Sequence, residues 1–168
     1  MSSQAKWNIL AQQVPMSQTD FKAGEGGAFN MDTWDGYLAD RDRLMDFLAK
    51  QKPSNPVCLS GDAHSHWAMD LKADFNNPQS AIVGSEIVCS SISSGGNGDD
   101  AVHRYFNTSD NPHIKFYNNR RGYVRCTLTP DTWKADYLSM LEVTTPFGTI
   151  SNRASFVVEN GRPGLQAD

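Results

Sequence analysis

A short apolar run that ends in a Ser-Gly break constrains the fold of this chain more than any other feature. The segment Val57-Cys58-Leu59 is apolar at every position, and Ser60-Gly61 follows it directly. A run without polar alternation is typical of a strand that is buried on both faces, so we expect helices or a second sheet on each side of it. Loops at strand ends often carry functional residues, and the glycine frees the backbone at this point.

Three polar side chains that can bind a metal ion follow this break at alternate positions, namely Asp62, His64 and His66. In extended backbone, alternate side chains point to the same face, so the spacing predicts that the three share one face. Imidazole nitrogen and carboxylate oxygen suit zinc, iron or manganese, and a carboxylate also suits calcium or magnesium. A cation held there would bind a phosphate group. The alternative is that Asp62 caps the turn and that the histidines are half-buried strand residues.

The composition narrows the class of protein. The chain has 168 residues, of which 39% are hydrophobic, and this is enough for one folded domain with a core. A net charge of -4 argues against a general nucleic-acid or anionic-membrane binder. It is compatible with a phosphate ester substrate, because a bound metal ion would invert the local field. No apolar run has transmembrane length, and the amino terminus lacks the apolar core of a signal peptide.

The three cysteines, Cys58, Cys89 and Cys126, cannot all pair with one another within the chain. Each lies in an apolar, strand-like stretch, which predicts buried and inert thiols. The alternative is that Cys58 lies close enough to Asp62 to take part in its chemistry.

The hydrophobic pattern predicts one helix followed by many strands. Apolar positions along one helical face indicate a helix over residues 37–50, with Asp35 as its N-cap, after a long polar loop over residues 17–36. Residues 118–122 are predicted to form a hairpin connection. One helix is too few to cover a sheet on both faces, so either two sheets cover each other or part of the fold lies elsewhere. The predicted strands cover residues 7–14, 57–59, 67–75, 81–92, 113–117, 123–129, 133–141 and 155–158.

Several further groups are weaker candidates for function. The glycine-rich run at 93–98 either presents backbone N–H groups to a phosphate or is a flexible turn. Arg120 and Arg121 either contact an anionic substrate or are solvated at a hairpin end. His103 and His113 are predicted to be surface loop residues.

A set of stretches spread along the chain forms a pattern far more specific than Asp62 and His64 alone. These stretches cover residues 7–14, 32–37, 59–67, 91–98, 111–116, 121–127, 133–137 and 154–157. Together they resemble the C-terminal part of the catalytic domain of the PhoD-type alkaline phosphatase/phosphodiesterase family, which is related to the metallophosphatases.

This resemblance implies an α/β fold. It would be the C-terminal portion of a four-layer αββα metallophosphatase sandwich, strand-rich and with one clear helix at 37–50. Residues 1–168 would form the C-terminal part of a PhoD-like catalytic domain, and the N-terminal half, with further metal ligands and the export signal, would be absent. The resemblance also implies export by the twin-arginine route, and therefore a secreted, periplasmic or cell-wall-associated protein.

The resemblance also implies metal-dependent hydrolysis of phosphate mono- and diesters, with iron and calcium as cofactors. Asp62 and His64 match the family's Gly-Asp-x-His motif, so they are expected to be catalytic residues and metal ligands, with His66 as a third candidate ligand. We expect activity only when the missing half completes the site. One alternative is a non-catalytic fragment or binding module, and another is an unrelated zinc hydrolase that uses these three residues. The expected partner is a phosphate ester, with no nucleic-acid-binding module and no transmembrane segment.

Overall fold

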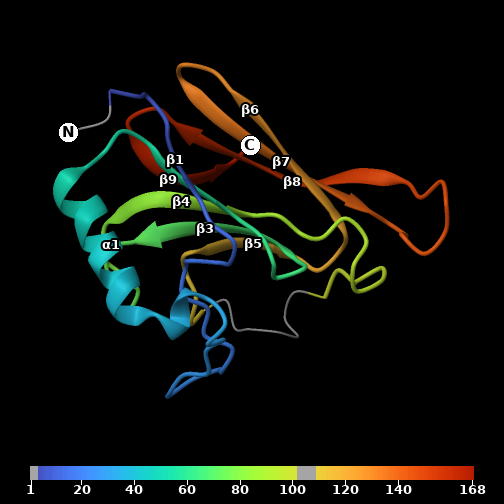
Figure 1. Ribbon diagram of the computed structural model, residues 1–168, viewed down its shortest axis with the longest axis horizontal. Coiled ribbons are helices and arrows are strands. Elements are labelled where there is room, and N and C mark those ends of the chain that lie inside the picture. Colours follow the sequence, from blue (N-terminus) through green and yellow to red (C-terminus); the bar gives the residue numbers. More distant parts are fainter. Residues whose placement is uncertain (1–3, 102–108) are drawn as a thin grey trace.

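The computed structural model describes residues 4–101 and 109–168, which form two stacked β-sheets with an α-helix against one of them (Figure 1). No helix in these residues is long and apolar enough to cross a membrane. In chain order the elements are β1 (Asn8–Ala11), the 3₁₀ helix η1 (Trp34–Gly36), α1 (Leu38–Gln51), β2 (Pro56–Ser60), β3 (His66–Lys72), β4 (Ile82–Val88), β5 (Ile114–Asn118), β6 (Gly122–Leu128), β7 (Thr132–Met140), β8 (Ile150–Glu159) and β9 (Arg162–Ala167).

The first sheet has five strands in the order β1-β2-β4-β3-β5. Strands β1, β2 and β4 run parallel, whereas β3 is antiparallel to both of its neighbours. The three parallel strands therefore end at the same edge of the sheet. This edge is where open α/β sheets usually place their ligand sites.

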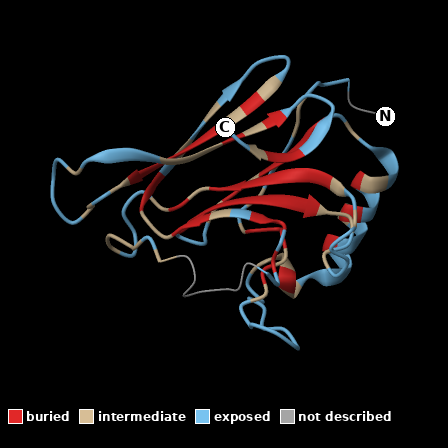
Figure 2. Cartoon of the chain, turned by 180° about the vertical axis from the view of Figure 1, so that it is seen from behind, coloured by how far each residue is buried: buried red, intermediate tan, exposed pale blue. Residues whose placement is uncertain are grey.

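The second sheet is antiparallel, in the order β6-β7-β8-β9, and it packs on the first. Figure 2 shows that the facing strands carry most of the buried residues. Trp133 and Tyr137 of β7 are the largest buried side chains of this interface, at 2% and 0% exposure. The core between the sheets consists of Val57, Ala68, Ile87, Trp133, Ala135, Tyr137, Phe156, Val158 and Leu165.

Helix α1 covers the opposite face of the five-stranded sheet, where Met45 and Leu48 pack against Cys58 of β2. Strand β2 is therefore buried on both faces, as its apolar run predicts. The predicted helix is confirmed within one residue at each end, but Asp35 is not its N-cap. The Asp35 carboxylate instead forms a buried ion pair with the Arg41 guanidinium.

Two further predictions about the strands were wrong. Residues 118–122 are not a hairpin connection, because β5 belongs to the first sheet and β6 to the second. Strand β9 was not predicted, because Gly161, Pro163 and Gly164 read as a turn. Proline is tolerated there because β9 is an edge strand, where a missing N–H group disrupts no central ladder.

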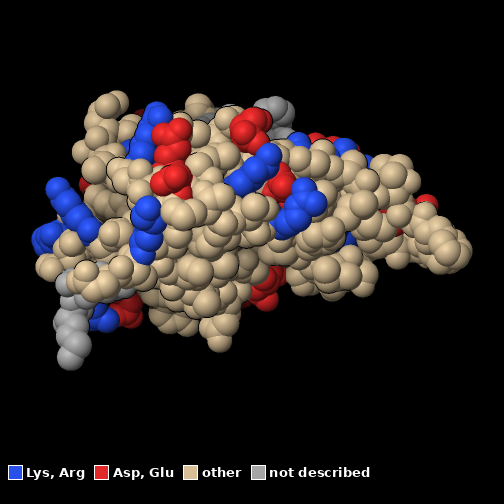
Figure 3. All heavy atoms as spheres, turned by 90° about the horizontal axis from the view of Figure 1, so that it is seen from above, with Lys and Arg blue, Asp and Glu red and all other residues tan. Residues whose placement is uncertain are grey.

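Charged side chains on the second sheet are paired. Asp136 of β7 lies 2.8 Å from Arg125 and 3.6 Å from Lys134, and Lys134 also pairs with Asp168. In Figure 3 the basic and acidic side chains are interspersed over the face shown. The described part of this face therefore carries no extended patch of one sign.

A buried carboxylate joins β4 to the segment that follows β1. Glu86 has no exposed surface, and it accepts hydrogen bonds from the backbone N–H groups of Met16 at 2.8 Å and Ser17 at 2.7 Å. The Ser60 hydroxyl at the end of β2 donates to the same carboxylate at 2.6 Å. Glu86 thereby holds together the ends of the three parallel strands.

We predict that Glu86→Ala lowers the free energy of unfolding by about 3 kcal/mol, because it leaves several buried donors without an acceptor. Urea denaturation monitored by circular dichroism measures this change. Glu159→Ala is the matched control, since Glu159 is exposed and its one ion pair among the described residues is with Arg162, so its cost should stay below about 1 kcal/mol. Equal losses for both variants would contradict the anchoring role of Glu86.

Candidate functional site

The loops that follow β1, β2 and β4 begin side by side at the carboxyl edge of the first sheet. The Gly61 N–H donates to the Gln13 carbonyl at 3.3 Å, and the Cys89 N–H donates to the Ser60 carbonyl at 2.9 Å. Asp62 and His64 lie in the loop between β2 and β3, so the structure places both at this edge.

The backbone of this loop is strained. Asp62 and His64 both have left-handed conformations, with φ of 66° and 50°, and both side chains are exposed. The Ala63 N–H donates to the Gly61 carbonyl at 2.8 Å, which closes a three-residue turn around Asp62. Such turns are rare and cost energy for residues other than glycine. Strained conformations of this kind cluster at functional sites, where the surrounding structure holds them in place.

The prediction that Asp62, His64 and His66 share one face of an extended strand was wrong. Two left-handed residues interrupt the alternation, and His66 begins β3 with no exposed surface. Its Nδ1 atom accepts a hydrogen bond from the Ser90 N–H at 3.2 Å, and its ring meets Tyr137 edge-on at 5.6 Å. The alternative of a strand histidine therefore describes its position better, and the role of His66 as a metal ligand stays a prediction.

The surroundings of His66 favour its uncharged form. Burial, with a smaller contribution from the nearby Arg121 guanidinium, lowers the pKa of His66 to about 4. Because Nδ1 accepts a hydrogen bond, the single ring proton resides on Nε2. The imidazole thus connects β3 to the loop after β4 through its Nδ1 atom.

The side chains of Ser65, just before β3, and Trp67, within β3, connect the strained loop to the sheet. The Ser65 hydroxyl donates to the Ala63 carbonyl at 3.1 Å, and the Trp67 indole N–H donates to the Ser65 oxygen at 2.7 Å. Trp67 in turn packs against Tyr117 with 4.4 Å between ring centroids. The loop is therefore tied to the core of the sheet.

Arg121 lies at this site, and it is not solvated at a hairpin end. Its side chain is buried, with the residue 4% exposed, and its guanidinium donates to the carbonyl oxygens of His64 and Gly96 and to the Ser90 hydroxyl. The neighbouring Arg120 points elsewhere and pairs with Asp100 at 2.8 Å. Sequence reasoning missed this difference, because two adjacent arginines look alike until the connection between the sheets is known.

The glycine-rich loop after β4 packs closely against the chain that leads into β6. Gly95, Gly96 and Gly98 all have positive φ values. A Cβ atom on Gly98 would lie 1.6 Å from the Asn119 carbonyl oxygen, so only glycine fits this approach. Whether this loop binds phosphate through its N–H groups stays a prediction.

Two of the possible metal ligands are not enough for a closed site. Within residues 4–101 and 109–168, no group of three or more His, Cys, Asp or Glu side chains is arranged to hold a metal ion. A zinc hydrolase built from Asp62, His64 and His66 alone would need at least three converging ligands, and that alternative stays untested. Asp62 and His64 remain an exposed carboxylate and an exposed imidazole on one braced loop.

The cysteines lie outside this chemistry. Cys58 is buried on the helix side of β2, and its thiol lies 3.8 Å from the Glu86 carboxylate. Burial and then this carboxylate raise the pKa of the Cys58 thiol. Burial also raises the pKa values of Cys89 and Cys126, and all three thiols are free. Inert thiols were predicted, although only Cys58 is fully buried.

The other histidines do not extend the site. His113 is buried, with its Nε2 atom 2.7 Å from the Gln18 carbonyl oxygen, so the prediction of a surface residue was wrong. His103 lies outside the described residues.

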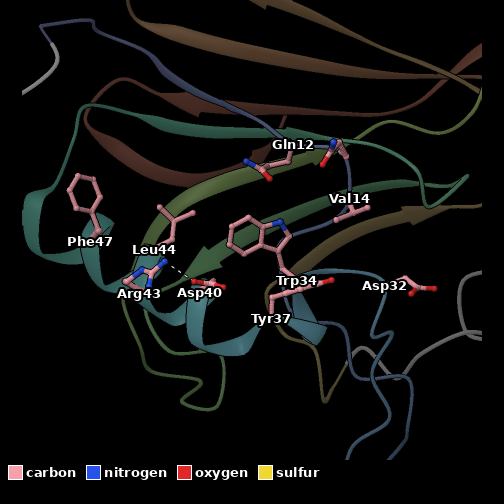
Figure 4. A pocket seen from close by; sticks show the side chains of 10 residues that line it. Gln12, Val14, Asp32, Trp34, Tyr37, Asp40, Arg43, Leu44 and Phe47 are labelled. Atoms are coloured by element: carbon pink, nitrogen blue, oxygen red, sulfur yellow. Dashed lines mark hydrogen bonds and ion pairs between the residues drawn. The ribbon is translucent and has the colours of Figure 1, made fainter.

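A cleft of about 880 Å³ lies beside the site, between the end of β1 and helix α1. Figure 4 shows Trp34 between the segment that follows β1 and the helix. The cleft includes Gln13, which contacts the Asp62 loop through Gly61, but neither Asp62 nor His64 lines it. The lining residues are Gln12, Gln13, Val14, Asp32, Trp34, Tyr37, Asp40, Arg43, Leu44 and Phe47.

We predict that Gly98→Ala destabilises the chain by about 2 kcal/mol more than Gly96→Ala, because an added methyl group meets the backbone only at Gly98. Both residues have positive φ, so the penalty for a left-handed alanine, about 1–2 kcal/mol, is common to the two variants. Thermal unfolding of both proteins measures the difference. Equal melting temperatures would show that this close approach does not constrain the loop.

Three comparisons with known proteins agree. The sequence matches the PhoD-like phosphatase family over residues 1–137. It is 46% identical over 166 residues to alkaline phosphatase D of Bacillus subtilis, and the match covers 98% of this chain. It also superimposes on a solved structure of PhoD with a TM-score of 0.91 and 46% identity, over 99% of this chain.

The chain spans only part of these relatives. The matches cover 28% of the length of the Bacillus subtilis protein and 32% of the solved PhoD chain. The fold thus corresponds to a strand-rich α/β portion of that structure, as the resemblance implied. Since the family match covers most of the chain and the fold agrees with it, this protein belongs to the PhoD-like phosphatase family.

Proposed function

We propose that this chain supplies the Asp62–His64 part of an active site that hydrolyses phosphate mono- and diesters. The observation that carries the proposal is the strained loop at the carboxyl edge of the parallel strands, in a chain 46% identical to alkaline phosphatase D. Asp62 and His64 are exposed at this edge, where a phosphate ester can approach them. The contacts of the loop hold the main chain of both residues in place before a substrate arrives.

The donor chemistry of the two side chains fits the proposed cofactors, iron and calcium. A carboxylate is a hard oxygen ligand that suits calcium, and a neutral imidazole suits iron. We therefore propose Asp62 and His64 as ligands, with His66 as the weaker candidate, because its Nδ1 atom already accepts a hydrogen bond from Ser90. When bound, such cations neutralise phosphate oxygens and activate water. This chain contributes the orientation of two ligands, and the remaining ligands must come from other residues.

The free edge of the first sheet supports completion by further polypeptide. Strand β1 lies at the edge of the sheet, so its outer side pairs with no described strand. Ile9 on β1 and Phe47 on α1 are 53% and 54% exposed beside it. Parallel sheets are normally covered along their edges and faces. We propose that the rest of a PhoD-type polypeptide packs along β1, and that the complete protein acts outside the cytoplasm, as the family resemblance implies.

Complementation tests this function. The 168-residue chain is co-expressed with the part of Bacillus subtilis alkaline phosphatase D that it does not match, and an aryl phosphate is assayed with iron and calcium. We expect a complex by size-exclusion chromatography and turnover by that complex, with none by the chain alone. A chelator should abolish turnover, and adding back both metals should restore it.

Variants of the chain test the two residues. Asp62→Asn and His64→Ala should each lower turnover of the complex at least about a hundredfold and reduce its metal content, because ligand losses exceed the effects of outer-shell changes. Asp42→Asn, an exposed carboxylate on α1, is the control and should leave turnover unchanged. Near-normal turnover and metal content in both site variants would overturn the assignment. A complex that forms but shows no turnover would favour the alternative of a non-catalytic binding module.

A further inference from the structure

We propose that Arg121 is a positioning residue, which locks the backbone of His64 and joins the loop after β2 to the loop after β4. This proposal rests on the proposed function only where it concerns catalysis. The loop connection itself is a property of the chain alone.

The contacts of Arg121 join three segments that are far apart in the sequence. Its Nη1 atom donates to the His64 carbonyl and to the Ser90 hydroxyl, the latter at 3.3 Å. Its Nε atom donates to the Gly96 carbonyl at 2.9 Å, and Nη2 makes a longer contact of 3.4 Å with the Asn119 side chain. One guanidinium thus connects the strained loop, the glycine-rich loop and the crossing into β6.

Arg121 differs from three other arginines of the fold in the groups that surround its charge. Arg41, Arg120 and Arg125 each pair with an aspartate. Within the described residues Arg121 has no carboxylate partner, although it is only 4% exposed. A buried guanidinium without a counter-charge costs stability and persists only when neutral oxygens surround it. If Arg121 served packing alone, a carboxylate partner would stabilise its charge better than neutral oxygens do. The neutral partners of Arg121 therefore indicate a role in holding the loops.

The contact with His64 has a direct consequence for the site. His64 has a φ of 50°, a conformation that costs a β-substituted residue about 1–2 kcal/mol. A hydrogen bond from a cation to the carbonyl of that residue fixes the orientation of its peptide group. Without this bond the backbone can relax toward a common conformation, which would change the direction in which the His64 imidazole leaves the loop. A lysine cannot replace the contact, because its single ammonium group lacks the planar fork that reaches several acceptors.

Amide hydrogen exchange on the 168-residue chain, measured by NMR, tests the proposal without any metal or substrate. In Arg121→Gln we expect exchange at least about tenfold faster at residues 62–65 and 95–98, while amides in the centres of β3 and β4 keep their protection. Arg121→Lys should give a smaller increase at the same residues. The His64 Cα chemical shift should also move away from its left-handed value in Arg121→Gln.

Arg120→Gln is the matched control, since it removes the adjacent guanidinium, which contacts Asp100 and the Leu141 carbonyl instead of the two loops. It should leave exchange at residues 62–65 unchanged. Unchanged exchange and an unchanged His64 shift in Arg121→Gln would overturn the proposal, as would a uniform loss of protection throughout the core. If Arg121→Gln does not fold, Arg121→Lys and Ser90→Ala replace it, and wild-type exchange at residues 62–65 in both would overturn the proposal.

In the complemented enzyme, Arg121→Lys should lower kcat and metal content together, with no loss of complex formation. This second result depends on the proposed hydrolase activity, whereas the exchange result does not. A complex without turnover therefore leaves the exchange measurement as the decisive test of Arg121.

Discussion

The burial of β2 on both faces is the constraint on which the rest of this structure depends. Val57 faces the second sheet and Cys58 faces helix α1, so the strand must lie between two layers. Parallel partners on each side, β1 and β4, complete its hydrogen bonding. Once three parallel strands lie together, their carboxyl ends meet, and the loops that follow them are adjacent without any further requirement.

Two buried charges then hold this edge in place from opposite sides. The Glu86 carboxylate receives backbone N–H groups from the segment after β1 and the hydroxyl at the end of β2. The Arg121 guanidinium donates hydrogen bonds to carbonyl oxygens of the loops after β2 and β4. Neither charge has an oppositely charged side chain among these partners. In both cases oriented neutral groups stabilise the ion, and the segments that supply those groups lose their freedom.

The elements of the fold were largely predictable, whereas the conformation of the site was not. Periodicity located α1 and most strands because each pattern depends only on neighbouring residues and on which side is buried. Periodicity failed at β9, because Pro163 and two glycines are typical of a turn. It also failed at residues 118–122, where the chain passes from the first sheet to the second. The family pattern identified Asp62 and His64 as the residues of interest. It carried no information that His66 would be buried beneath Tyr137 or that Arg121 would reach His64.

The sequence by itself determined the buried strand, the helix, the family and the positions of the candidate residues Asp62 and His64, because these follow from local composition and from a motif. Only the tertiary structure decided that Asp62 and His64 are exposed in left-handed backbone while His66 is enclosed. It alone also decided that one of two adjacent arginines is the buried link between loops. The physical reason is that backbone strain and the burial of a charge depend on acceptors brought from distant segments. Those acceptors come together only when the two sheets stack.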